Sequence, residues 1–323
     1  MKVLVTGGAG YIGSVTSELL LDAGFEVVVF DNLERGHRAA VDARARFIPG
    51  DLRDRDSIMG AMAKEKPDGV LHFAAYALVG ESMEKPELYF RNNVAGGVFL
   101  AESMVAAGVK RIVFSSTCAT YGVPERNPID EDAPQRPSNP YGESKLMLEK
   151  ILDWHARLHG LEPVFLRYFN AAGATVKFGE DHSPESHLIP NVLKVALGQA
   201  PEVRVFGDDY RTPDGTCIRD YIHIADLAQA HILALEGRHS GAFNLGTGEG
   251  FSVKEVLSVA REVTGHAIPA QVVARRPGDP DRLVAAADKA KRVLGWRPRY
   301  AALRTIVESA WEWARRHPRG YAR

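Results

Sequence analysis

The sequence predicts an α/β fold, with a doubly wound parallel sheet followed by a smaller C-terminal α/β lobe. The first observation is that short, continuous apolar runs alternate with helical stretches over the first half of the chain. Such runs are typical of parallel strands, because helices bury both faces of each strand. The second is a glycine-rich loop directly after the first run. The third is a change to proline- and glycine-containing loops after about Asn170.

The expected elements follow in order along the chain. Six runs are strand candidates: VLVT (3–6), VVVF (27–30), RFIP (46–49), VLHF (70–73), RIVFSS (111–116) and PVFLRYF (163–169). A helix should run from about Tyr11 to Ala23 and be closed by Gly24. We divide the chain into a first domain, 1–173, and a second lobe, 174–323. The segment around 220–250, with AFNLG (242–246), is expected to return to the main sheet.

Composition argues against several classes of protein. The 323 residues carry 40 Lys and Arg against 41 Asp and Glu, so no general basic surface is available for nucleic acid or an anionic membrane. Cys118 and Cys217 give neither a disulfide framework nor a metal-ligand spacing, which indicates a reducing compartment and no metal site. The apolar run at the N-terminus is too short for a signal peptide, and no run approaches a membrane span. We therefore expect a soluble cytoplasmic protein.

The loop TGGAGYIG (6–13) lies between the first strand and the first helix, the position of a dinucleotide-binding fingerprint. Gly7, Gly10 and Gly13 would allow a tight turn, a close approach to a pyrophosphate and helix–strand packing, as in a Rossmann-type domain. An ordinary tight turn is the alternative. Asp31 ends the second strand, where a carboxylate accepts from an adenine-ribose hydroxyl and repels a 2′-phosphate, so NAD is favoured over NADP. Asp51 could face the adenine or simply form a turn.

The stretch NPYGESKLMLEK (139–150) begins a predicted helix, with Asn139 and Pro140 at its start. Tyr141 and Lys145 are four residues apart, so they would lie on one face of that helix. A surface pair without function is the alternative for such a spacing in isolation. A lysine cation near a tyrosine favours the phenolate, and we expect Lys145 and the positive nicotinamide to lower the pKa of Tyr141 from its usual value of about 10.

Seven ordered motifs carry a resemblance to a known family: TGGAGYIG, HFAAYALVGES, VFSSTCATYG, YGESK, RYFNAAG, RDYIHIADLA and NLGTG. Together they resemble the extended short-chain dehydrogenase/reductases over essentially the whole chain. Within that family they are most similar to the UDP-glucose 4-epimerases. The resemblance implies an NAD-binding first domain, a nucleotide-sugar-binding lobe and a homodimer.

The resemblance also implies an activity, the interconversion of UDP-glucose and UDP-galactose through a 4-keto sugar. It makes Tyr141 the catalytic base and acid, Lys145 the residue that holds the nicotinamide ribose, and Thr117 a hydrogen-bonding partner of the sugar 4-hydroxyl. The cofactor-binding positions that it implies are Gly7, Gly10, Tyr11, Ile12, Gly13, Asp31, Asn32, Asp51, Leu52, Phe73, Ala74, Ala75, Asn92, Ser115, Tyr141, Lys145 and Tyr168.

The substrate-binding positions follow from the same resemblance. They are Thr117, Tyr141, Asn170, His187, Leu188, Arg219, Tyr221, Arg276, Asp279 and Leu283. Asn170, Arg219 and Arg276 match diphosphate contacts, and Asp279 matches a uridine-ribose contact. Leu283 matches the gate beside the sugar C2 substituent, where Leu in place of Tyr would also admit UDP-N-acetylhexosamines.

Simpler interpretations stay open for several of these positions. The arginines could be solvated surface charges, Tyr168 and Phe169 core residues, Asn92 a helix cap, and Leu283 a packing residue. His72, on an apolar strand, is interpreted as a core histidine with a satisfied hydrogen bond. The Leu/Met stripe of the helix over 146–158 is interpreted as packing or as a dimer face.

Some positions depart from the family pattern, and other activities share its frame. Ala77 stands where some members have a lysine near the cofactor phosphates, His187 where many have Asn, and Val15 where His is common.

A UDP-pentose 4-epimerase is an alternative. A decarboxylase or dehydratase is less favoured, because Cys118 and Ala119 follow Thr117 where dehydratases carry an Asp-Glu pair. A non-catalytic NAD-binding protein is the alternative outside enzymes.

Overall fold

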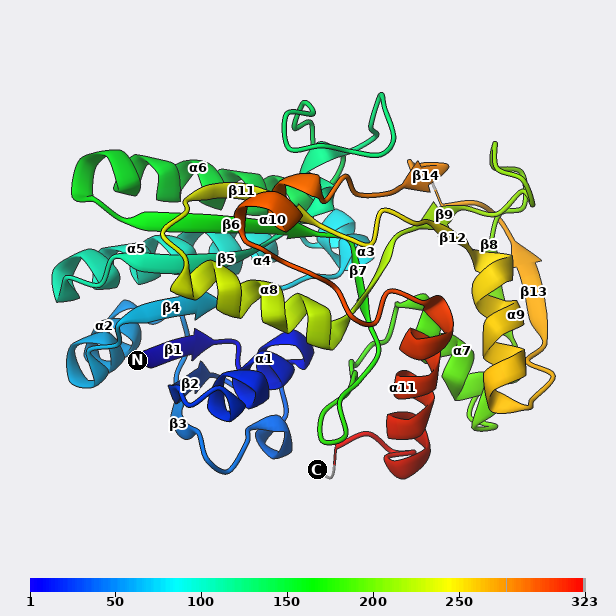
Figure 1. The fold of residues 1–323 in the computed structure, drawn as a ribbon, viewed down its shortest axis with the longest axis horizontal. Helices are drawn as coiled ribbons and strands as arrows, with labels where there is room; N and C mark the ends of the chain where they lie inside the picture. The colour runs from blue at the N-terminus through cyan, green and yellow to red at the C-terminus, as the bar shows by residue number, and fades with distance from the viewer. Residues whose placement is uncertain (277, 322–323) are drawn as a thin grey trace.

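The structure, a computed structural model that describes residues 1–276 and 278–321, is built around a seven-stranded parallel sheet (Figure 1). Its strands, in spatial order, are β11 (Gly241–Leu245), β6 (Glu162–Tyr168), β5 (Arg111–Thr117), β4 (Gly69–His72), β1 (Lys2–Thr6), β2 (Glu26–Asp31) and β3 (Arg46–Pro49). The sheet confirms the predicted doubly wound α/β fold. Strand β11 pairs with β6, so the chain returns to the main sheet late in its course.

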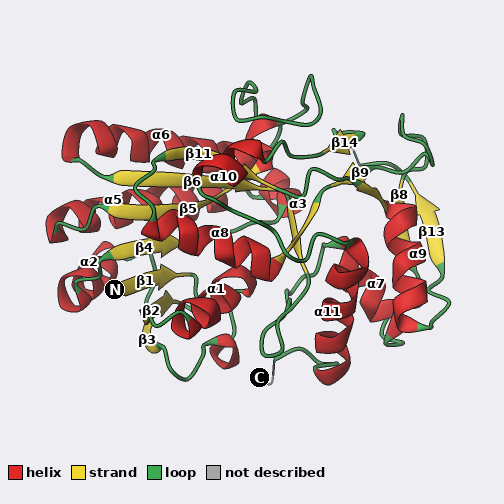
Figure 2. Cartoon of the chain, viewed as in Figure 1, coloured by secondary structure: helices red, strands yellow, loops and turns green. Residues whose placement is uncertain are grey.

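Helices cover both faces of this sheet, as Figure 2 shows. One face is covered by α2 (Arg55–Glu65), α5 (Gly96–Ala107) and α6 (Pro140–His159), and the other by α1 (Tyr11–Asp22) and α8 (Ile224–Glu236). Val3 and Val5 of β1 belong to the α1/α8 core, whereas Leu4 between them belongs to the α2/α5/α6 core. Successive residues of a strand point to opposite faces, so a strand buried on both sides is mostly apolar.

The second lobe packs around a separate apolar core beyond the carboxyl ends of the main strands (Figure 1). Its elements are α7 (Leu188–Ala196), β8 (Val203–Phe206), β9 (Ile218–Arg219), β12 (Phe251–Ser252), α9 (Val253–Thr264), β13 (Ala270–Val273), β14 (Arg282–Leu283) and α11 (Leu303–Arg316). The short parallel pair β7 (Asn170–Ala172) and β10 (Tyr221–His223) lies outside the main sheet. The domain boundary at residue 173 stays a prediction.

Smaller elements complete the described chain. They are the 3₁₀ turns η1 (Arg38–Ala40) and η3 (Cys118–Tyr121), the helices α3 (Val79–Glu84), α4 (Pro86–Tyr89) and α10 (Asp288–Val293), and the π-helical segment η2 (Phe90–Ala95). Helix α1 ends one residue before the predicted Ala23, and Gly24 follows in the left-handed region with φ 85°. Every helix in the described ranges is too short or too polar to serve as a membrane span.

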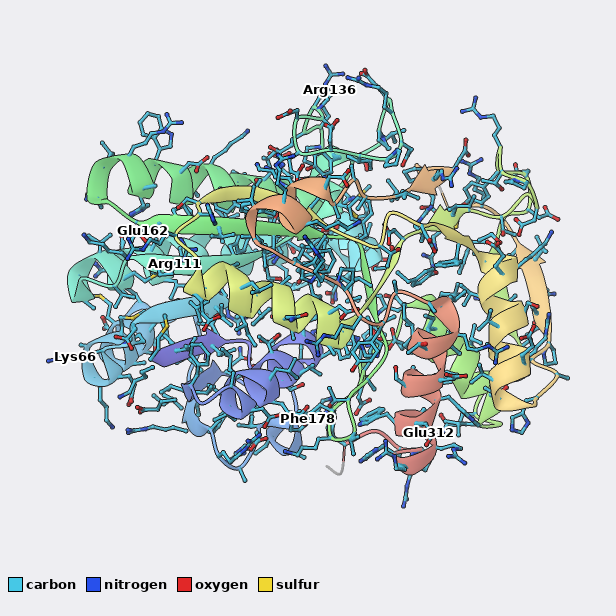
Figure 3. The ribbon with its side chains drawn as sticks, in the orientation of Figure 1. Lys66, Arg111, Arg136, Glu162, Phe178 and Glu312 are labelled. Carbon is cyan, nitrogen blue, oxygen red and sulfur yellow. The ribbon has the colours of Figure 1, made fainter. Side chains whose placement is uncertain are left out.

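The sheet has a free end and a covered end. Arg111 and Glu162, which begin β5 and β6, lie at the end of the sheet away from the second lobe, as Figure 3 shows. The carboxyl ends of the same strands face the lobe (Figure 1). In open α/β sheets ligands bind in the crevice outside the carboxyl ends of the strands. The candidate site therefore consists of residues at these ends.

Candidate active site

The loop after β1 is shaped around glycines that no other residue could replace without strain. Gly7 has φ 73°, and a Cβ atom there would lie 2.4 Å from the backbone nitrogen of Ala74. A Cβ atom on Gly13 would lie 2.3 Å from the carbonyl oxygen of Gly7. The loop is therefore in close contact with the segment 73–75 that follows β4, so the structure brings these two groups of predicted cofactor residues together.

Helix α1 begins at this loop with its N-terminus open. Gly10 precedes the helix, and none of the side chains that the structure describes caps its first turn. The free N–H groups of that first turn, which includes Tyr11 and Ile12, can therefore donate to a phosphate, and the helix dipole favours its negative charge. The Tyr11 side chain points elsewhere, because its hydroxyl donates to the carbonyl oxygen of Gly173 at 2.6 Å. The glycine loop and the open helix fit a dinucleotide pyrophosphate.

Asp31 holds the position expected for a ribose contact. Its two carboxylate oxygens accept the backbone N–H groups of Ala9 at 3.0 Å and Leu33 at 2.8 Å, which fixes the carboxylate beside the glycine loop. Burial raises the pKa of Asp31 above its ordinary value, and the two N–H donors oppose that rise. A ribose hydroxyl could donate to the remaining lone pairs.

The next predicted residues lie beside Asp31 at the ends of β2 and β3. Asn32 donates to the Asp51 carboxylate at 2.9 Å, and hydrogen bonds from Arg53 lower the pKa of Asp51 to about 2. The backbone N–H of Arg53 also donates to Asp51 at 2.8 Å, so the turn-forming interpretation of Asp51 is realised. Its contact with adenine stays a prediction. Leu52 is buried among the residues beneath α2 and α5.

Helix α6 positions Tyr141 and Lys145. The Asn139 side chain accepts the N–H of Gly142 at 2.9 Å and so caps the helix, as the sequence predicts. Tyr141 and Lys145 follow on one face, with the Lys145 ammonium 6.0 Å from the centre of the Tyr141 ring. That ammonium donates to the backbone carbonyl of Ser115 at 2.8 Å, which anchors the helix to β5. The surface-pair alternative is wrong, because Lys145 is only 3% exposed.

Thr117 ends β5 beside this pair. Its hydroxyl oxygen accepts the N–H of Ala119 at 3.1 Å, so the hydroxyl proton is available to another acceptor. Burial raises the pKa of Tyr141 to about 12, and a side-chain hydrogen bond with Thr117 opposes the rise. Burial likewise lowers the pKa of Lys145 to about 7.

The sequence predicts that Lys145 and a positive nicotinamide together lower the pKa of Tyr141, which stays a prediction. The protein's own groups raise this pKa. The physical reason is that both groups are buried, and removal from water disfavours the charged form of each. The positive charge of a nicotinamide ring is then the main remaining influence that could favour the phenolate.

Ser115 and Tyr168 lie next to Lys145 at the carboxyl ends of β5 and β6, with their hydroxyl groups hydrogen-bonded to each other. Tyr168 also belongs to the main apolar core and Phe169 is buried, so packing roles are realised for both. His72 is buried, with Nδ1 2.7 Å from the Thr6 hydroxyl, which confirms its interpretation as a satisfied core histidine.

The predicted diphosphate and ribose residues gather in the second lobe. Arg219 of β9 forms an ion pair with Asp279 at 2.5 Å, and the Tyr210 hydroxyl donates to the same carboxylate at 3.0 Å. The Arg276 guanidinium stacks over the Phe206 ring, 3.9 Å from its centre. The side chain of Arg219 is 11% exposed, so it is not an ordinary solvated surface charge. A diphosphate would compete with Asp279 for it.

Other predicted substrate residues lie around this group. Asn170 and Tyr221 are partners in the β7–β10 pair, and Tyr221 is buried. Leu283 of β14 is aligned with Arg219 of β9. Leu283 is half-buried and packs on a small apolar cluster that includes Phe169. This position is compatible both with a packing role for Leu283 and with its predicted role as a gate beside the sugar C2 substituent.

His187 and Leu188 are at the start of α7, where His187 is the residue that precedes the first helical turn. Asn92 lies inside the continuous helical run from α4 through η2 to α5, so the helix-cap interpretation of Asn92 is wrong. Its amide donates to the neighbouring Asn93 at 3.0 Å.

Comparison with known proteins identifies the family of the chain. A model of the NAD dependent epimerase/dehydratase family matches residues 3–246. The chain belongs to this family. Over 328 aligned residues it is 55% identical to a UDP-glucose 4-epimerase of Halalkalibacterium halodurans, covering 100% of this chain and 98% of that relative.

Solved structures agree with this placement in the epimerase/dehydratase family. A crystal structure of a UDP-glucose 4-epimerase matches with a TM-score of 0.97 and 51% identity, covering 100% of both chains. Another from Bifidobacterium longum, in complex with NAD+ and UDP, matches with a TM-score of 0.95 and 40% identity, covering 99% of this chain and 100% of that one. The resemblance inferred from the sequence motifs is confirmed.

In this member of the family, sequence reasoning missed two groups that support the candidate catalytic residues. The first is Asn93, which is buried and exchanges hydrogen bonds with the Tyr76 backbone at 2.9 and 3.0 Å. Its amide also donates to Ser144 at 3.0 Å, between Tyr141 and Lys145 on α6. A buried polar side chain that joins three segments could not be recognised from spacing alone.

The second is a buried ion pair one helical turn beyond Lys145. Glu149 of α6 accepts hydrogen bonds from Arg167 of β6 at 3.0 and 2.6 Å, and from the Ser116 hydroxyl of β5. The side chains of Glu149 and Arg167 are 4% and 7% exposed. This pair fixes α6 to the sheet and so determines where Tyr141 and Lys145 lie.

Proposed function

We propose that this protein interconverts UDP-glucose and UDP-galactose by oxidation and re-reduction at C4 of the sugar, with NAD as its cofactor. The observation that carries the proposal is the convergence of Thr117, Tyr141 and Lys145 at the carboxyl end of β5. The glycine loop that fits a dinucleotide lies at the same end of the sheet. The full-length similarity to UDP-glucose 4-epimerases supports the same activity.

Each of the three residues has a distinct part in the proposed reaction. Tyr141 accepts the proton of the sugar 4-hydroxyl and later returns it to the 4-keto sugar. Thr117 donates its free hydroxyl proton to the sugar or tyrosine oxygen, and Lys145 holds the nicotinamide ribose. NAD, when bound, would supply an acceptor and donor for the C4 hydride, so the protein would need no other redox partner.

Return of the hydride to the opposite face requires the 4-keto sugar to turn while its UDP stays bound. Arg219 and Arg276 are suited to hold the diphosphate, because a guanidinium binds phosphate oxygens bidentately. Asn170 and Asp279 would add diphosphate and ribose contacts. The hexose itself then needs few fixed contacts, which leaves it free to rotate.

Incubation of the purified protein with UDP-galactose, without added cofactor, tests this proposal. We expect formation of UDP-glucose until the two sugars reach equilibrium. A transient absorption in the reduced-nicotinamide band would also separate an enzyme from a non-catalytic NAD-binding protein. No UDP-glucose after addition of NAD would reject the proposed activity.

Dehydration remains the less favoured reaction on this frame. It requires an additional acid and base for C5 and C6, and the candidate positions after Thr117 hold Cys118 and Ala119. Burial raises the pKa of the Cys118 thiol to about 12, so it is a poor proton donor or acceptor near neutral pH. UDP-pentose 4-epimerisation uses the same chemistry at C4 and is the alternative that substrate comparison must test.

Cofactor choice gives the first prediction. Asp31 should select NAD, because a 2′-phosphate would lie against a buried carboxylate. Denaturation of the purified protein should release NAD or NADH, identified by chromatography. NADP(H) as the main released species would contradict the role of Asp31. Asp31→Asn should reduce the ratio of the affinity for NAD to the affinity for NADP, because it removes the negative charge and retains the shape of the side chain.

Sugar range gives the second prediction. Leu283 lacks the ring and hydroxyl of a tyrosine at this position, so we expect slow conversion of UDP-N-acetylglucosamine beside fast conversion of the hexose pair. Leu283→Tyr should abolish the N-acetyl activity and spare UDP-galactose turnover. Leu283→Met, which nearly conserves volume, is the matched control and should retain both activities. If the wild type fails to convert UDP-N-acetylglucosamine at high enzyme concentration, the gate at Leu283 is not open.

Assembly and location are further parts of the proposal. Helix α6 exposes Met147, Trp154 and Leu158 at spacings of seven and four residues, which are typical of one helix face. This apolar face supports a homodimer, which sedimentation of the purified protein would test. The two unpaired thiols, Cys118 and Cys217, are consistent with a reducing cytoplasm.

A further inference from the structure

Four side chains between β7 and α7 form a cluster that the proposed reaction does not use as a unit. They are Glu180, His182, Glu185 and His187, and one ligand atom of each lies within 4.8 Å of the others. The Nδ1 atoms of His182 and His187 lie 3.1 and 2.8 Å from the same Glu180 oxygen. The Nδ1 atom of His187 also lies 2.9 Å from Glu185. The two imidazoles and two carboxylates therefore converge on one point.

The two carboxylates need positive charge at this point. Their side chains are nearly buried, at 8% exposed for Glu180 and 2% for Glu185. In the described part of the chain, their ion pairs are formed with His182 and His187 and with no lysine or arginine. Removing a carboxylate from water is costly unless a positive charge compensates it. Two protons on the histidines can provide that compensation, and so can one divalent cation.

We propose that this cluster binds a Zn²⁺ ion through the two histidine Nδ1 atoms and one oxygen from each glutamate. A tetrahedral zinc site with bonds of about 2.0–2.2 Å places its ligand atoms about 3.3–3.6 Å apart. The Nδ1 atoms of His182 and His187 lie 3.7 and 2.9 Å from different oxygens of Glu185, so this carboxylate must turn to present one oxygen to a shared ion. The four ligand atoms lie within 4.8 Å of one another, so side-chain rotations can bring them to one cation. Two carboxylates, two neutral imidazoles and Zn²⁺ form an electrically neutral site.

The surroundings favour zinc over the hard cations. Imidazole nitrogen is a preferred ligand of Zn²⁺, whereas Mg²⁺ and Ca²⁺ select oxygen. Glu185 is already oriented, because one of its oxygens accepts the backbone N–H groups of Ser186 and His187, each at 2.7 Å. Such outer contacts hold metal ligands in place. Glu180, His182 and Glu185 also line a cavity against α11, which gives an ion a path to the site.

The position of the cluster suggests what a bound ion would do. The ring of His182 meets the ring of Tyr11 edge-on, with 6.2 Å between their centres, and Tyr11 begins the helix after the glycine loop. His187 directly precedes α7 of the second lobe. The loop that carries the cluster runs past α11 near the C-terminus (Figure 1). In Figure 3 the labelled residues Phe178 and Glu312 mark this loop and α11. Zinc would therefore join the cofactor-binding loop to the lobe that carries the candidate substrate residues.

This inference departs from the absence of a metal site expected from the sequence, which was based on the two cysteines. The ligands are instead spaced E-x-H-x₂-E-x-H over residues 180–187. That pattern lies in a loop, where spacing does not determine which side chains converge. Only the folded loop shows that all four reach one point.

Metal titration tests the proposal directly. The protein is stripped with a chelator and dialysed, and Zn²⁺ is added in competition with a chromophoric chelator. We expect one Zn²⁺ per chain, and at least a tenfold loss of affinity in His182→Gln and in Glu185→Gln. His37→Gln is the matched control, because His37 is similarly half-buried and pairs with Asp181 outside the cluster. It should bind Zn²⁺ as the wild type does.

Two further measurements do not depend on a variant that must fold. Co²⁺ added to the stripped wild type should give the intense visible absorption of a tetrahedral site, and Zn²⁺ should remove it. Zn²⁺ should also raise the midpoint of thermal unfolding, whereas Mg²⁺ should not, because a ligand that binds only the folded state stabilises it. Less than one Zn²⁺ bound per chain at micromolar concentration, or equal binding by folded His182→Gln and Glu185→Gln variants, would overturn the proposal. The cluster would then be only a quartet of ion pairs.

Discussion

Replacement of Tyr141 by phenylalanine should lower the rate of epimerisation by about 10²–10⁴-fold, the usual contribution of a positioned general acid–base. The change removes the hydroxyl that exchanges a proton with the sugar and keeps the ring that packs at the start of α6. The rate is measured as conversion of UDP-galactose with saturating substrate and added NAD. Circular dichroism would show that the fold is intact.

The control for Tyr141→Phe is Tyr89→Phe. Tyr89 is fully buried, and its ring meets that of the partly buried Tyr141 edge-on with 6.4 Å between centres. Its hydroxyl, however, donates to the backbone carbonyl of Leu78 at 2.6 Å. Loss of that hydroxyl should change turnover by only a few-fold. If Tyr141→Phe retains turnover close to that of Tyr89→Phe, the proton-transfer role of Tyr141 is wrong.

The second large effect should come from the buried ion pair between α6 and β6. Glu149→Gln leaves the Arg167 charge buried without its partner, so we expect the free energy of unfolding to fall by about 3–5 kcal/mol. Urea unfolding followed by circular dichroism measures the change. Epimerase activity should fall as well, because the same contact fixes the helix that carries Tyr141 and Lys145.

Two further variants test whether the loss of stability comes from the buried, unpaired charge of Arg167 or from the loss of any charged side chain. Glu102→Gln removes one partner of the half-exposed ion pair with Arg55 and should change stability by only about 0–1 kcal/mol. The double variant Glu149→Met with Arg167→Met should recover much of the lost stability, because it leaves no unpaired buried charge. A double variant as unstable as Glu149→Gln would show that packing, not charge, is responsible.

The sequence predicted the fold because its strongest patterns are local. Continuous apolar runs identified the main strands to within one residue at each end, since a strand buried on both faces is mostly apolar. The glycine loop could be placed because only glycine allows Gly7 and Ala74 to approach so closely. Asn139 and Pro140 likewise indicated where α6 begins.

The rest of the site depends on contacts between distant segments. Nothing near Asn93 in the sequence indicates that it would join Tyr76 to Ser144, and Glu149 is indistinguishable from an exposed helix residue until Arg167 is placed beside it. The effect of burial on the pKa of Tyr141 could not be predicted for a related reason. The sequence shows the neighbouring charge of Lys145, but burial depends on the complete fold.

The contact between α6 and β5 has a consequence for how such a chain can vary. Tyr141, Lys145 and Glu149 lie on successive turns of one helix. Their side chains form hydrogen bonds with Thr117, Ser115 and Ser116 of the adjacent strand β5, respectively. A single inserted residue within 141–149 would rotate everything beyond it by about 100°, because the helix has 3.6 residues per turn. The loop 122–138, on which Figure 3 labels Arg136, projects away from the sheet but is fixed at Ile129, which is buried and pairs with Ala285. Insertions and deletions should therefore accumulate at the mostly exposed positions 123–126 of that loop, while the length of the segment 141–149 stays fixed even where its outward-facing residues change.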